Sequence, residues 1–245
     1  MKSTGAQPAI GNRTGMQTSP ELAEELVEGA ASSTPSSEGG PENIAESRTG
    51  YISQGFPLGS MPLMPVSEEA DADEDQTQMA VLMDKLSERL AFERMGVRLY
   101  EALLNKCEAL GEESPGPSLE DIRRIGGDEL EHFLMLNQTI IDLGGDPTVE
   151  SPSADVAAVT SMGILQVLTD PRSSVPQCLQ ALLTAELTDN AGWEMLIEMV
   201  GSLGYDDIRG HFETALANEE EHLQNVRNWV SDCIMDKMQV ESDSE

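Results

Sequence analysis

Basic residues are scarce in this 245-residue sequence, in which Lys+Arg 14 stand against Asp+Glu 45 and the net charge is −31. A chain this acidic repels nucleic-acid phosphates and anionic membrane surfaces, because it has no basic patch to replace their counterions. The sequence also lacks the ~18–20 consecutive apolar residues of a membrane span, and its first ten residues lack the apolar segment of a signal peptide. We therefore expect a cytosolic protein that binds neither nucleic acid nor membranes.

Cysteine is rare as well. Cys107, Cys178 and Cys233 are far apart, and no CxxC pair occurs. This pattern argues against both a disulfide framework and a thiolate metal site. We interpret the three thiols as buried packing residues.

The sequence changes character near residue 78. Residues 1–78 are rich in Ser, Gly, Pro, Thr and Glu and poor in aromatics, so they cannot bury enough apolar surface to offset the entropy of ordering. We expect a disordered acidic tail, with a short helix within Ser19–Val27. The apolar, Pro-broken segment Phe56–Val66 is typical either of a docking peptide or of an anchor onto the chain's own domain. The folded domain is expected at 79–240, with a disordered end at 241–245.

From Met79 onward the apolar residues recur every three or four positions, which indicates helices. Four apolar stripes run from Leu82 to Leu104, Ile122 to Leu143, Leu179 to Val200 and Ile208 to Cys233. Gly111 is expected to end the first helix, Ser118 to cap the second, and Gly201 and Gly204 to break the third. The long connection Thr148–Val175 contains a further short helix at 154–168. We predict an all-α four-helix bundle of two hairpins joined by a long crossover.

Each apolar stripe is interrupted near its middle by a glutamate: Glu93, Glu129, Glu186 and Glu219. A buried carboxylate costs several kcal/mol unless a cation compensates it. We find no Lys or Arg on the four stripes, so we expect the compensating charge to come from metal ions.

Two of the stripes add a histidine three residues after the glutamate, in Glu129–His132 and Glu219–His222. This spacing places a carboxylate and an imidazole one helical turn apart on the same inward face. Carboxylate and imidazole ligands suit iron or manganese more than copper(I) or thiolate-bound zinc. A degenerate site with hydrogen-bonded or protonated carboxylates is the alternative.

The two halves of the bundle repeat this arrangement. Tyr100 follows Glu93 by seven residues, and Trp193 follows Glu186 by seven residues. We interpret both aromatics as inward-facing packing residues, with a radical-quenching or electron-relay role as the alternative. The repeat indicates two related hairpins that share one site.

With one Glu on each of two helices and Glu-x-x-His on the other two, the sequence resembles the ferritin-like superfamily of di-iron carboxylate proteins. The resemblance lies in the branch of bacterioferritin and rubrerythrin and covers roughly Met79–Met238. It implies six metal ligands: Glu93, Glu129, His132, Glu186, Glu219 and His222. It further implies two iron ions, or manganese or a mixed pair, bridged by Glu129 and Glu219. The implied activity is ferroxidase or peroxidase chemistry with O2 or peroxide.

The sequence departs from these relatives in two ways. It has no Cys-rich electron-transfer module, and it ends soon after the fourth helix, where ferritins have a fifth helix that helps to close a cage. A homodimer is therefore expected rather than a storage cage. The alternative function is a metal-binding cargo or interaction protein without significant turnover, which its N-terminal tail docks to a protein partner or shell.

Several other polar residues near the stripes are assigned to less direct roles. Asp189 and Asn190, one turn after Glu186, are candidates for orienting a ligand. His211 is expected at the surface. The glutamates that flank the stripes are expected to form a solvated face: Glu101, Glu131, Glu194, Glu220 and Glu221.

Overall fold

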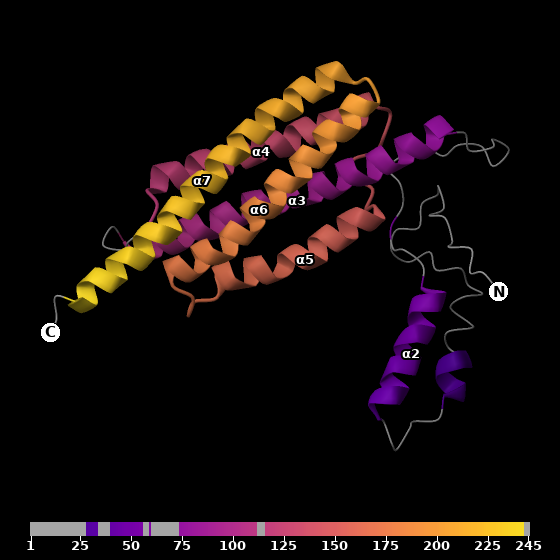
Figure 1. Ribbon diagram of the computed structural model, residues 1–245, viewed down its shortest axis with the longest axis horizontal. Coiled ribbons are helices and arrows are strands. Elements are labelled where there is room, and N and C mark those ends of the chain that lie inside the picture. The colour runs from indigo at the N-terminus through magenta and orange to yellow at the C-terminus, as the bar shows by residue number, and fades with distance from the viewer. Residues whose placement is uncertain (1–27, 34–39, 56–58, 60–73, 112–115, 243–245) are drawn as a thin grey trace.

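The computed structural model describes residues 28–33, 40–55, 59, 74–111 and 116–242. Four long helices form an antiparallel bundle (Figure 1). They are α3 (Glu74–Leu110), α4 (Leu119–Asp142), α6 (Val175–Ser202) and α7 (Asp206–Ser242). The predicted all-α four-helix bundle is thus confirmed.

The helices pair as two hairpins. Helix α3 packs along α4 and α6 packs along α7, while α3 also contacts α6 across the bundle. The crossover contains α5 (Pro152–Thr169), which lies along α3 and also touches α6 (Figure 1). The long connection therefore carries the chain from one hairpin to the other, as the sequence predicts.

Local sequence signals explain where the helices begin and end. The Ser118 hydroxyl accepts a hydrogen bond from the Asp121 backbone N–H at 3.1 Å, so Ser118 is the predicted N-cap of α4. Gly111 follows α3 at φ +79° and Gly204 follows α6 at φ +78°, the left-handed region that glycine adopts without strain. Gly201 was expected to break the helix but lies inside α6, because helix interiors tolerate single glycines.

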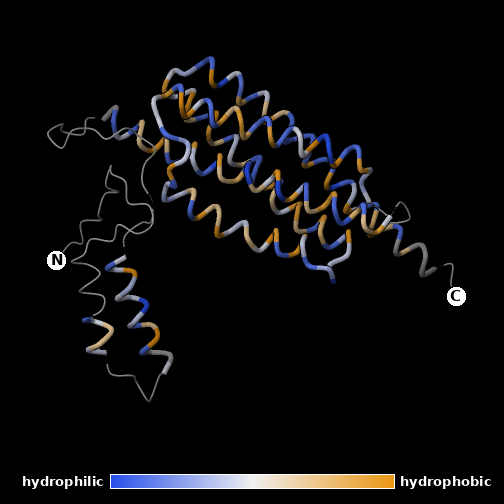
Figure 2. Tube along the Cα trace, turned by 180° about the vertical axis from the view of Figure 1, so that it is seen from behind, coloured by the Kyte–Doolittle hydropathy of each residue, from blue (hydrophilic) through white to orange (hydrophobic). Residues whose placement is uncertain are grey.

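The bundle core consists of two apolar clusters separated along the helix axes. One cluster includes Leu99, Leu103, Ile125 and Leu182. The other includes Leu86, Leu136, Trp193 and Phe212. Each fully buried side chain of this size stabilises the fold by about 1.5–3 kcal/mol. Hydrophobic and hydrophilic residues alternate along the long helices as amphipathic helices require (Figure 2).

The N-terminal region contains a helix that we did not predict, α2 (Pro41–Gln54), which lies apart from the bundle (Figure 1). Among the described residues, α2 contacts none of the other helices. Its apolar side chains Tyr51 and Ile52 are 79% and 81% exposed. A lone helix of this length is marginal in water, so the expected disorder of the tail stays a prediction. The segments Ser19–Val27 and Phe56–Val66 lie outside the described residues, apart from Gly59.

No helix in the described part of the chain is long and apolar enough to cross a membrane. The expected cytosolic location stays a prediction. The three cysteines are buried and form no disulfide, as expected.

Candidate metal centre

All six predicted ligand side chains lie in the bundle interior, at the level between the two apolar clusters. Each of them is at most 4% exposed. They come from all four bundle helices: Glu93 from α3, Glu129 and His132 from α4, Glu186 from α6, Glu219 and His222 from α7. The inward orientation that the periodicity predicts is therefore correct for all six.

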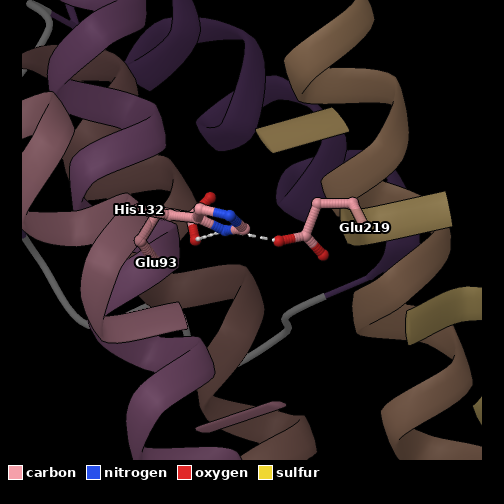
Figure 3. Close-up of side chains that lie close together, drawn as sticks. All are labelled: Glu93, His132 and Glu219. Atoms are coloured by element: carbon pink, nitrogen blue, oxygen red, sulfur yellow. Dashed lines mark ion pairs between the residues drawn. The ribbon is translucent and has the colours of Figure 1, made fainter. Parts of the chain in front are cut away.

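The Glu219 carboxylate joins the two histidines. His132 Nδ1 lies 2.7 Å from Glu219 Oε1, and His222 Nδ1 lies 3.2 Å from Glu219 Oε2. His132 Nδ1 also lies 3.7 Å from Glu93 Oε2, so this imidazole stands between two carboxylates (Figure 3). Both imidazoles thus present Nδ1 to the centre of the cluster.

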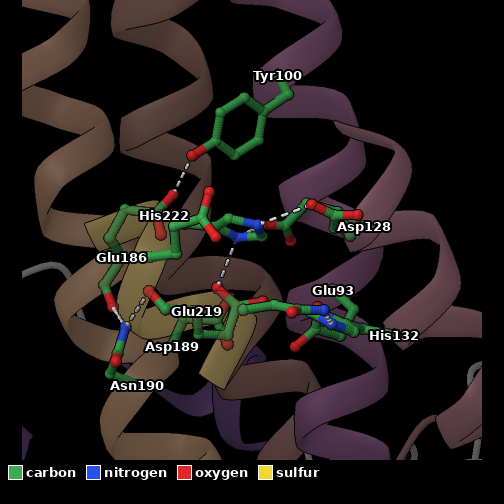
Figure 4. Close-up of polar contacts among 12 residues, drawn as sticks. Glu93, Tyr100, Asp128, His132, Glu186, Asp189, Asn190, Glu219 and His222 are labelled. Carbon is green, nitrogen blue, oxygen red and sulfur yellow. Dashed lines mark hydrogen bonds and ion pairs between the residues drawn. The ribbon is translucent and has the colours of Figure 1, made fainter. Parts of the chain in front are cut away.

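The far nitrogen of each histidine faces a residue at the edge of the site. His222 Nε2 lies 3.1 Å from Asp128 Oδ2 (Figure 4), and His132 Nε2 lies 3.4 Å from the side-chain nitrogen of Asn218. A carboxylate in the position of Asp128 accepts the far N–H of an imidazole and so fixes the orientation of a metal-binding histidine. Asp128 was not among the predicted site residues, although its position directly before Glu129 was a signal.

Glu186 behaves differently from the other three glutamates. The Tyr100 hydroxyl donates a hydrogen bond to Glu186 Oε1 (Figure 4). Asn190 was expected to orient a ligand side chain, but its amide instead donates to the backbone carbonyls of Glu186 at 2.9 Å and Glu219 at 3.1 Å, which ties α6 to α7. Tyr100 is therefore more than a packing residue, because it holds one of the predicted ligands.

One premise of the sequence analysis is wrong: a cation does reach the cluster. Arg89 is only 4% exposed. Its Nε lies 3.2 Å from Glu93 Oε1 and its Nη1 lies 3.1 Å from Asp189 Oδ1. Arg89 precedes Glu93 by one helical turn and so shares its inward stripe, which was the signal that could have revealed it. Metal ions are thus not the sole source of positive charge here.

Three groups of side chains bring one donor atom each to within 4.8 Å of one another: Glu93–His132–Glu219, Glu129–Glu219–His222 and Glu93–Glu129–Asp189–Glu219. Glu219 belongs to all three, which agrees with a central position. Within the described residues, Glu186 joins none of these groups. Asp189, which we considered only as an orienting residue, joins one.

Burial and mutual repulsion shift the pKa values in this cluster strongly. Burial, reinforced by the charges of Glu219 and Glu93, raises the pKa of Glu129 well above its usual range. Burial also raises the pKa of Glu186 to about 8. Burial opposes ionisation of Glu219 too, but hydrogen bonds with His132 and His222 outweigh it and lower the pKa of Glu219 to about 2.

His132 carries the complementary shift. Burial lowers its pKa, but hydrogen bonds with Glu219 and Glu93 prevail and raise the pKa to about 9. Without a metal ion, bound protons thus supply the positive charge between these side chains.

The cluster has the properties of a cation site. Two buried carboxylate oxygens have neither a hydrogen-bond nor an ion-pair partner among the described residues: Oε2 of Glu129 and Oε2 of Glu186. Buried polar atoms without partners are rare in native proteins. The carboxylate and imidazole chemistry of the cluster fits divalent iron or manganese. The residues present therefore fit a pair of such ions.

A glycine provides the space for one of these carboxylates. A Cβ placed on Gly96 of α3 would lie 2.0 Å from Glu129 Oε2. No side chain can occupy that position unless Glu129 moves. Gly96 therefore leaves the space that the Glu129 carboxylate occupies.

A comparison with protein families matches residues 120–235 to the ferritin-like domain. The chain contains a ferritin-like domain, with buried carboxylate and histidine clusters typical of di-metal sites. The match spans α4 to α7, and α3 completes the bundle and supplies Glu93 to the cluster. Neither a search of curated proteins nor a search of solved structures returned a match. The finer assignment to the bacterioferritin and rubrerythrin branch stays a prediction.

The polar residues assigned to the surface lie there. His211 is exposed. The flanking glutamates are exposed as well: Glu101, Glu131, Glu194, Glu220 and Glu221. The ferritin-like domain thus separates its acidic residues into a solvated set and a small buried set.

Proposed function

We propose that the ferritin-like domain binds two iron ions, or manganese or a mixed pair, and oxidises Fe(II) with O2 or peroxide. The observation that carries the proposal is the arrangement around Glu219. Two imidazoles from different hairpins present Nδ1 to this one carboxylate, and the buried Oε2 of Glu129 makes no hydrogen bond among the described residues. Such an arrangement needs cations between its groups.

The chain's own residues would divide into ligands and supports. Glu93, Glu129 and Glu219 with His132 and His222 would hold the ions, and Glu186 is the sixth proposed ligand. When bound, a pair of Fe(II) ions supplies two electrons, enough with two protons to convert O2 to H2O2, or H2O2 to two water molecules.

The surrounding protein would keep the site dry and its ligands in place. The apolar clusters on both sides exclude bulk water, which strengthens every electrostatic interaction inside. The Tyr100 hydroxyl keeps its proton on the bond to Glu186, because burial and then the Glu186 charge raise the pKa of Tyr100 well above its usual range. Asp128 orients His222 so that its Nδ1 faces the centre.

Two measurements test the proposal. Elemental analysis of the purified protein should find two iron or manganese ions per chain. Stopped-flow absorbance should detect rapid oxidation of added Fe(II), and Glu219→Ala should abolish both results. The exposed neighbour Glu220→Ala is the matched control and should change neither. Metal binding without oxidation would support a metal-holding protein instead, and no binding at all would overturn the proposal.

A further inference from the structure

We propose that Arg89 is a permanent internal cation of the centre, which neutralises Asp189, keeps this carboxylate from serving as a metal ligand, and limits the site to the charge of two divalent ions. This inference rests on the proposed di-metal function. It concerns a residue that the metal-ligand pattern of the sequence does not contain.

The contacts of Asp189 show why it needs such a partner. Its carboxylate belongs to a group with Glu93, Glu129 and Glu219 whose oxygen atoms lie within 4.8 Å. Arg89 Nη1 lies 3.1 Å from Asp189 Oδ1, and it also donates a hydrogen bond to the Asp189 backbone carbonyl at 3.1 Å. The guanidinium therefore fixes both the side chain and the backbone of Asp189.

The charges of the site agree with this role. Five acidic side chains are buried among the described residues: Glu93, Glu129, Glu186, Asp189 and Glu219. Arg89 is the buried basic side chain of this layer, and the histidines are neutral when they bind metal. Ionised, these groups leave a net charge of −4, since five negative charges meet one positive charge. Two divalent ions neutralise that charge, whereas without Arg89 one negative charge would remain.

The surroundings of Arg89 hold it in one place. A Cβ on Gly192 of α6 would lie 1.9 Å from Arg89 Nη1, so the guanidinium occupies the space that this glycine leaves. The guanidinium carbon lies 4.2 Å from the centre of the Phe92 ring, a favourable cation–π contact. Arginine also remains charged at every physiological pH. Arg89 is thus a fixed charge and not a switch.

If Arg89 acts as a fixed charge, removing Arg89 and removing the Asp189 charge should change the metal affinity in opposite directions. Removing Arg89 frees Asp189 and removes a repulsive charge, so divalent ions should bind more tightly. Removing the Asp189 charge leaves the positive charge of Arg89 without this partner. Arg89 then repels the metal ions more strongly, so they should bind more weakly. Removing both charges restores the net charge of the original site.

The test is Mn(II) binding to the full chain, measured by calorimetry and by the electron paramagnetic resonance signal of free Mn(II). Arg89→Met should lower the dissociation constant roughly tenfold or more, and Asp189→Asn should raise it roughly tenfold or more. The double variant should return to within about threefold of the original protein. Arg94→Met, an exposed arginine on the same helix, is the matched control and should change nothing.

A merely structural role would give a different pattern. Both single variants would then bind Mn(II) more weakly, and the double variant would be the weakest of all, which would overturn the inference. Failure of Arg89→Met to fold would support the inference if the double variant folds and binds normally, and would overturn it if the double variant also fails. Absence of both Mn(II) and Fe(II) binding by the original protein would refute the proposed function itself, a separate result.

Discussion

Replacing Glu129 by glutamine should make the metal-free protein more stable while it weakens metal binding. Glu129 is 1% exposed, its Oε2 makes no hydrogen bond with any residue that the structure describes, and burial raises its pKa well above the usual range. In the metal-free protein near neutral pH this side chain therefore keeps a proton that the unfolded chain releases. Glutamine is neutral in both states and avoids this difference.

The magnitude follows from linkage. When a group is protonated only in the folded state, the free energy of unfolding falls by about 1.4 kcal/mol for each pH unit above the group's unfolded pKa. With an ordinary value of 4.5 for Glu129, the penalty at pH 7 is about 3 kcal/mol, and at pH 5 it is below about 1 kcal/mol. The advantage of Glu129→Gln should therefore grow as the pH rises. For a chain of this size, about 3 kcal/mol corresponds to roughly 6–12 °C in melting temperature.

Metal ions should reverse the order of stability. At a hundredfold excess over the dissociation constant, one bound ion stabilises the folded state by about 2.7 kcal/mol. The original protein should gain at least this much with Mn(II), while Glu129→Gln should gain much less. Urea denaturation with a chelator at pH 5 and pH 7 measures the stability advantage of Glu129→Gln and its dependence on pH. Repeating it with Mn(II) measures how much each protein gains from the metal. The exposed Glu131→Gln on the same helix is the control.

One result would refute this reasoning. If Glu129→Gln destabilises the metal-free protein equally at pH 5 and pH 7, Glu129 is a structural hydrogen-bond acceptor and its burial carries no proton-linked cost. A gain in stability that Mn(II) leaves undiminished would likewise show that Glu129 takes no part in metal binding.

Three further predictions concern other parts of the chain. Gly96→Ala should displace Glu129, because the new Cβ would lie 2.0 Å from Oε2, so calorimetry should show metal affinity reduced roughly tenfold or more; unchanged affinity would contradict this. Tyr100→Phe should leave Glu186 Oε1 without its hydrogen-bond donor and destabilise the metal-free protein by about 1–3 kcal/mol in urea denaturation; an equally large loss in the metal-loaded protein would argue against a ligand role for Glu186. Deleting residues 1–73 should preserve the helical circular dichroism and the metal stoichiometry, and should abolish co-purification with any partner of the tail; unfolding of the shortened chain would show that the tail packs on the bundle.

Helical periodicity in the sequence is enough to predict the bundle and the glutamates and histidines of its polar centre, but not Arg89 or Asp128. Helical periodicity is a local property, so the stripes place Glu93, Glu129, Glu186 and Glu219 on inward faces before any packing is known. Local signals also fixed the end of α3 at Gly111. These predictions are confirmed because one turn of helix encodes them.

The partners that these side chains meet follow from how the helices pack against one another. The bond from Tyr100 to Glu186 and the pair Arg89–Asp189 both join α3 to α6, and they depend on how deeply two helices far apart in the sequence approach each other. The spacing of residues along one helix contains no such information, and it does not show that Gly192 leaves the space that the Arg89 guanidinium occupies. The sequence therefore indicates that a charged centre exists, while the packing of α3 against α6 decides how its charges are balanced.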